Sequence, residues 1–178
     1  MRAFHRPLAI VLIATLLSIV PTSALASAPS PPSAHSATAA AVVKFAFHAG
    51  LAFGAFRYLI YKPYRAGDFT HGSFLHKLAA YVKAGAAALF CYHEVKLALA
   101  DAKSSKLLSR LVSPLNSLVA LFATVVAKVK ARDLGGAAGT LKSASSTASS
   151  VEHSAASAGA SVSEKVPSAA QLLAGVAA

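Results

Sequence analysis

Apolar residues recur at three- and four-residue intervals between positions 107 and 129, which restricts this stretch to an amphipathic α-helix. On a helix of 3.6 residues per turn they share one face, made of Leu107, Leu111, Leu115, Leu118, Val119, Phe122, Val125, Val126 and Val129. Ser113 and Pro114 interrupt the pattern, and serine followed by proline is a favoured helix start. We therefore expect a short helix over 104–112 and a longer one over 114–132.

Two longer stretches, 38–62 and 73–102, are also predicted to be helical. The first should end at Pro63, because proline lacks the N–H that a helix interior needs. The short connector makes the two helices an antiparallel hairpin, which the 104–132 segment would cover. No segment alternates convincingly with the two-residue period of a strand, so the predicted fold class is an all-α bundle.

The 38–62 helix is apolar around most of its circumference, so it should be buried on most sides or lie against lipid. Gly50 and Gly54 stand four residues apart, a spacing that lets a second helix approach closely. A true membrane span is disfavoured, because polar groups would lie at or near membrane depth: Lys44, His48 and Arg57.

The ends of the chain have a different character from the predicted helical domain, residues 38–134. Residues 1–26 combine two arginines, an apolar run of about 13 residues and a small-residue site, as in a secretory signal peptide cleaved after Ala26; a retained signal anchor is the alternative. Residues 27–37 are a Pro/Ser/Ala tether. The tail, 135–178, is rich in alanine and serine, and we expect a marginal helix with a thin apolar seam, or disorder.

The chain is strongly basic. After removal of the signal peptide it carries 15 basic and 6 acidic residues, a net charge of +9. A cation exported in this way should meet anionic lipid headgroups, a cell-wall polymer or another envelope protein, and the export signal argues against nucleic acid as the partner. The candidate contacts with an anionic surface are Lys62, Arg65, Lys128, Lys130 and Arg132.

No sequence motif of an enzyme is present, so we expect a non-enzymatic protein. One ligand site is worth testing. If the two hairpin helices pack antiparallel, His48 lies at the level of His93, and two histidines on facing helices can ligate haem or a transition metal. Tyr92 and Cys91 would line that site. The competing interpretation places His48 in solvent and His93 in the core, with Cys91 as a buried, inert thiol.

Glu94 can reach Lys44 across the same interface, and this ion pair would fix the register of the hairpin. Two functions follow from these patterns. The first is a basic helical protein of the bacterial cell envelope that attaches to an anionic membrane, a wall polymer or a secreted partner. The alternative is a small secreted bundle that holds haem, a metal or an apolar ligand between the hairpin helices.

Overall fold

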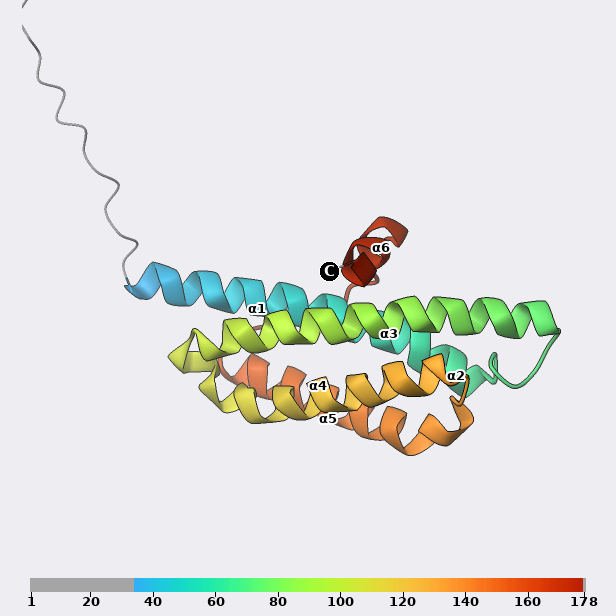
Figure 1. Cartoon of the computed structure of the whole chain (residues 1–178). Coiled ribbons are helices and arrows are strands. Elements are labelled where there is room, and N and C mark those ends of the chain that lie inside the picture. The colour runs from blue at the N-terminus through green and yellow to red at the C-terminus, as the bar shows by residue number, and fades with distance from the viewer. Residues whose placement is uncertain (1–33, 178) are drawn as a thin grey trace, which may run out of the picture. The chain divides into compact units, whose positions relative to one another are not determined.

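The computed structural model describes residues 34–177, which lie in one compact unit, and the predicted signal peptide and residues 27–33 of the tether fall outside this range. The fold is an all-α bundle, as predicted (Figure 1). Its α-helices are α1 (Ala34–Phe56), α2 (Lys62–Ala66), α3 (Phe74–Lys103), α4 (Val112–Lys130), α5 (Ala138–Ser157) and α6 (Ala169–Ala177). Three short pieces connect them: η1 (Arg57–Tyr61), η2 (Lys106–Leu111) and η3 (Gly135–Ala137).

The predicted helical hairpin is confirmed, since α1 and α3 lie side by side along most of their length (Figure 1). α4 packs on α3, α5 packs on α4, and α6 rests on α3. The apolar side chains of these helices meet in a single core, whose largest fully buried members are Phe45, Phe53, Phe90 and Phe122. As its composition indicated, α1 is buried around most of its circumference from Ala49 to Phe56.

The first helix does not end at Pro63, contrary to the prediction. It passes through the π-helical turn η1, in which the backbone N–H of Lys62 bonds to the oxygen of Arg57, and continues as α2. Pro63 sits in the first turn of α2, where its missing N–H matters least. The chain turns only at Gly67, which has a positive φ of 82° and ends α2.

The amphipathic face predicted for the third helical segment is largely confirmed. Leu111, Leu115, Leu118, Phe122, Val125 and Val129 are all buried. Leu107 is an exception, because it is 57% exposed while its neighbour Leu108 is fully buried. The reason is local: residues 106–111 form a 3₁₀ helix, which has three residues per turn and so rotates Leu107 off the α-helical face.

Over residues 135–177 the Ala/Ser-rich tail belongs to the same unit as the rest of the bundle. α5 buries the predicted seam against the core, with Leu141, Ala144, Ala148, Val151 and Ala155 buried. Tertiary packing therefore stabilises a helix whose own propensity is weak. Residues 34–37, assigned to the tether from the sequence, form the first turn of α1.

After α5 the chain runs extended over residues 160–168 and crosses α1 at Gly50 and Gly54. A β-carbon on either glycine would collide with a backbone oxygen of this segment, that of Ser163 or Lys165. The close approach predicted from the glycine spacing is real, but the partner is an extended segment and not a helix.

Within residues 34–177, three stretches are long and apolar enough to cross a membrane by length and composition: Thr38–Ala66, Phe74–Ser104 and Lys106–Lys130. In the bundle all three contribute side chains to the common core, so their apolar character is partly explained by packing within the protein.

Candidate functional site

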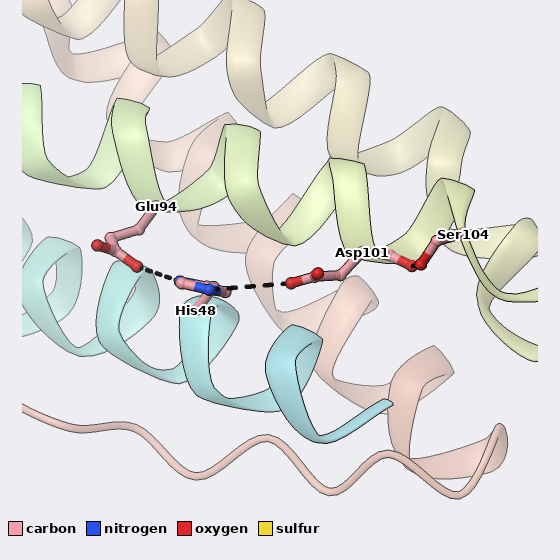
Figure 2. A network of polar contacts seen from close by, with 4 residues as sticks. All are labelled: His48, Glu94, Asp101 and Ser104. Carbon is pink, nitrogen blue, oxygen red and sulfur yellow. Dashed lines mark hydrogen bonds and ion pairs between the residues drawn. The ribbon is translucent and has the colours of Figure 1, made fainter. Parts of the chain in front are cut away.

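His48 joins the two hairpin helices through a pair of carboxylates (Figure 2). Its Nδ1 donates a hydrogen bond to Glu94 Oε2 at 2.7 Å, and its Nε2 lies 3.9 Å from Asp101 Oδ2. Glu94 and Asp101 stand seven residues apart on α3, which is two helical turns, so both carboxylates face α1 and the imidazole fits between them. This contact fixes the register of α1 against α3.

Asp101 is the less satisfied of the two acids. Its Oδ2 is buried and accepts no hydrogen bond from the residues that the structure describes. Burial raises the pKa of the Asp101 carboxyl, while the nearby charges of His48 and Lys44 work in the opposite direction. The Ser104 hydroxyl bonds to the backbone oxygen of Asp101 at 2.7 Å and leaves that carboxyl free.

The predicted His48–His93 site does not have the geometry of a shared metal or haem site. Both ring nitrogens of His48 face the carboxylates of α3. His93 is half-buried and lines a groove of about 220 Å³ together with Phe47, Phe90 and Glu94. Within residues 34–177, no group of three or more His, Cys, Asp or Glu side chains is placed to hold a metal ion.

Cys91 and Tyr92 also differ from their predicted roles in that site. Cys91 is fully buried, and its thiol donates to the backbone oxygen of Ala52 at 3.2 Å. Burial, together with the charge of Glu94, raises the pKa of this thiol, which disfavours the thiolate that a metal would require. The ring of Tyr92 is half-buried and lies under the ammonium group of Lys96, 5.4 Å from the ring centroid.

The predicted Lys44–Glu94 ion pair is replaced by the His48–Glu94 contact. Among the ion pairs of the described residues, Glu94 has His48 as its partner, while Lys44 is exposed and acts on Asp101. The register-fixing role expected for an ion pair at Glu94 is thus filled by a residue one helical turn further along α1.

The five basic residues predicted to contact an anionic surface gather at one end of the bundle. Lys62 and Arg65 lie on α2, and Lys128, Lys130 and Arg132 lie at the end of α4 (Figure 1). Both groups border the first turns of α3: Pro63 of α2 shares a groove with Lys83, and the Tyr81 hydroxyl donates to the backbone oxygen of Arg132 at 3.1 Å.

Lys128 is partly neutralised, because it pairs with Asp133 at 2.7 Å. The other four basic residues are exposed and form no ion pair with any described residue. Lys77 and Lys83 of α3 add positive charge to the same end.

The first turns of α3 also expose large apolar side chains, which the sequence alone did not single out. Phe74 is 70% exposed, Leu75 73% and Val82 67%. Leu78, half-buried, lies between them and lines a groove of about 240 Å³ with Phe74 and Arg132. We call this surface the basic tip; it comprises Phe74, Leu75, Leu78 and Val82 with Lys62, Arg65, Lys77, Lys83, Lys130 and Arg132.

Comparisons with protein-family models, with curated proteins and with solved structures give no match.

Proposed function

We propose that the protein is exported and attaches, without enzymatic activity, to an anionic membrane surface through its basic tip. The observation that carries the proposal is the exposure of Phe74, Leu75 and Val82 at the same end of the bundle as six lysines and arginines that form no ion pair with a described residue. An exposed apolar group bordered by cations is the pattern of proteins that lie in the interfacial region of a bilayer.

The two kinds of side chain support each other energetically. Burial of a leucine or phenylalanine side chain contributes about 1.5–3 kcal/mol, and each lysine or arginine near an anionic leaflet adds about 1 kcal/mol. Three apolar groups and several cations together are enough for reversible attachment, since stable anchoring generally needs two such signals.

A lipid surface suits this end better than a wall polymer does. The cations alone would serve for either partner, because both are anionic. Only a bilayer also offers hydrocarbon for Phe74, Leu75 and Val82, which otherwise remain exposed to water.

Flotation with lipid vesicles tests the proposal. The protein is isolated from cells that express the full chain, and its N-terminus is determined by intact mass. We expect it to float with phosphatidylglycerol vesicles at low salt, and to float less at high salt because surface charges are then screened. Neutral phosphatidylcholine vesicles should bind it weakly.

Matched variants locate the contact. The double variant Phe74→Ser, Leu75→Ser should lose flotation, whereas Val43→Ser, Leu173→Ser removes two equally exposed apolar residues elsewhere and should retain it. Arg65→Gln, Lys130→Gln should weaken binding more than Lys96→Gln, Lys103→Gln, which changes the net charge equally. Equal effects of the paired variants, or flotation that ignores both salt and lipid charge, would rule out attachment through the tip.

A further inference from the structure

A second concentration of positive charge lies at the opposite end of α3, in a groove between η2 and the last turns of α5. The groove has a volume of about 430 Å³. Its rim carries Lys106 and Arg110 from η2 and His153 from α5, together with the hydroxyls of Ser154 and Ser157. No acidic residue lines it. None of its three basic side chains forms an ion pair with a described residue.

These cations are not needed to cap α5. Basic residues often satisfy the free carbonyl groups at the end of a helix, but here the backbone already does so. Gly159 adopts a positive φ of 80°, its N–H bonds to the oxygen of Ala156 at 3.0 Å, and the N–H of Ala160 bonds to that of Ala155 at 2.8 Å. This is a Schellman motif, and the positive charge around the groove is left without an internal partner.

We propose that this groove binds the phosphate group of a small organic phosphate monoester. Such a group carries up to two negative charges and three acceptor oxygens. The planar guanidinium of Arg110 can bind two of those oxygens at once, and Lys106 and His153 supply further donors. Ser154 and Ser157 line the groove beside them, although the Ser157 hydroxyl already donates to the backbone oxygen of His153 at 3.1 Å.

The shape of the groove indicates that the ligand is more than a free phosphate ion. A volume of about 430 Å³ leaves room beyond the phosphate for a glycerol- or sugar-sized body. That body would lie against Leu107, which is 57% exposed on the groove wall although Leu108 beside it is fully buried. The rotation of η2 that removes Leu107 from the core thus supplies the apolar contact.

The groove and the basic tip serve different ligands. α3 has 30 residues and is about 45 Å long, and the two sites lie at its two ends (Figure 1). A bilayer in contact with the tip does not reach the groove. The ligand of the groove is therefore a soluble phosphate ester, or a phosphate headgroup on a membrane other than the one that the tip contacts. This inference does not depend on the proposed membrane attachment.

Titration calorimetry at fixed ionic strength tests the site, with inorganic phosphate and glycerol 3-phosphate as probes and sulfate as a comparison anion. We expect saturable binding of both phosphates, tighter for the ester. Arg110→Gln should weaken it about tenfold, the loss of one charge-assisted contact, and His153→Gln should weaken it by removing the imidazole as a hydrogen-bond donor. These side chains are exposed, so the fold should tolerate both changes, which circular dichroism can check. Arg65→Gln, at the other end of the bundle, should have no effect.

The absence of saturable binding would overturn the proposal, and so would an equal loss in Arg65→Gln, which would mean only diffuse attraction to a basic protein. Vesicles containing phosphatidate, whose headgroup is a monoester, identify the source of the phosphate. If the protein binds these vesicles, and if both Arg110→Gln and competition by glycerol 3-phosphate abolish that binding, the groove is assigned to a lipid headgroup. If Phe74→Ser, Leu75→Ser left that vesicle binding intact, the groove would hold the protein on these vesicles without the tip, and attachment through the tip would be judged separately on phosphatidylglycerol vesicles.

Discussion

The backbone N–H of Lys165 donates a hydrogen bond to the backbone oxygen of Gly50, 3.0 Å away. The bond joins the backbone of α1 to that of an extended segment. The segment can lie this close to α1 because neither Gly50 nor Gly54 has a β-carbon, which would collide with it. Arg57, one turn further along, forms an ion pair with Glu164 of the same segment. The C-terminal part of the chain is therefore held on the bundle by backbone and side-chain contacts together.

The first prediction concerns this crossing. Gly54→Ala should displace the segment, because the new methyl group would collide with the oxygen of Lys165. We expect the free energy of unfolding to fall by about 1–3 kcal/mol, typical of overpacking, and trypsin to cut the native protein more readily after Lys165. Urea denaturation and limited proteolysis measure the two effects.

Gly139→Ala is the matched control. Gly139 lies in α5, and a β-carbon there would meet no atom within 4 Å. The same substitution should raise the stability by up to about 1 kcal/mol, because alanine is the better helix former. If both variants behaved alike, the close contact at Gly54 would not be what fixes the segment.

These glycines also illustrate how far the sequence alone could lead. Their spacing predicted a close approach to α1, but nothing in it distinguished a helix from an extended segment as the partner. That choice depends on a tail whose helical propensity is weak and whose position is set by tertiary contacts. Likewise, the helical periods correctly placed Leu115, Leu118 and Phe122 in the core, because a repeating pattern averages over local detail.

The candidate sites were harder to predict, since each depends on one or two residues. The sequence left two positions open for His48, at the helix interface or in solvent, and the structure places it half-buried at the α1–α3 interface with Glu94, not His93, as its partner. His93, expected in the core under the second interpretation, is half-buried. His93 and Glu94 are neighbours in α3, so a rotation of α3 by part of a turn decides which of them faces His48. A helical-wheel projection of the sequence does not fix the rotation of a helix that accurately. Leu75 and Val82 are exposed because none of the helices within residues 34–177 covers that end of α3, and no local pattern in the sequence reports this.

Arg57→Gln should destabilise the protein in a pH-dependent way. Arg57 lies between Glu164 and Glu152, the latter 3.7 Å away, and burial raises the pKa of the Glu152 carboxyl while Arg57 opposes that shift. Without the guanidinium the two carboxylates repel each other, and we expect a loss of about 2 kcal/mol at neutral pH.

That loss should shrink as the pH falls through the range of glutamate, because protonation removes the repulsion. Urea denaturation from pH 7 to pH 4 measures it, with Arg65→Gln as the control for loss of an exposed charge that has no ion-pair partner among the described residues. A loss that did not depend on pH would assign the effect to packing of the arginine side chain and not to its charge.

Asp101→Asn and Asp133→Asn should change stability in opposite directions. Burial raises the pKa of Asp101, so its ionisation above that pKa disfavours the folded state, and the asparagine variant should be more stable at pH 7. Hydrogen bonds from Lys128 and the Gly136 N–H lower the pKa of Asp133, so its ionised form favours the folded state and Asp133→Asn should be less stable there.

Both differences should vanish at a pH well below the usual range of aspartate, about 4, because each carboxyl is then neutral in the folded and unfolded chains. Urea denaturation at several pH values follows both variants. Changes of the same sign at neutral pH would show that the contacts of His48 with α3, and not the burial of Asp101, dominate at that position.

Cys91 offers a probe of how the bundle opens. Its thiol is fully buried against Ala52, and burial raises its pKa, so a thiol reagent at pH 8 should label the native protein far more slowly than the urea-unfolded chain. The control is an exposed thiol, Lys96→Cys in a Cys91→Ala background, which should react at the rate of a free cysteine.

Because labelling of Cys91 then requires an opening of the α1–α3 interface, His48→Ala should accelerate it by leaving Glu94 buried without its partner. Fast labelling of the unchanged protein would contradict the burial of the thiol, and an unchanged rate in His48→Ala would mean that the contact with Glu94 does not hold the two helices together.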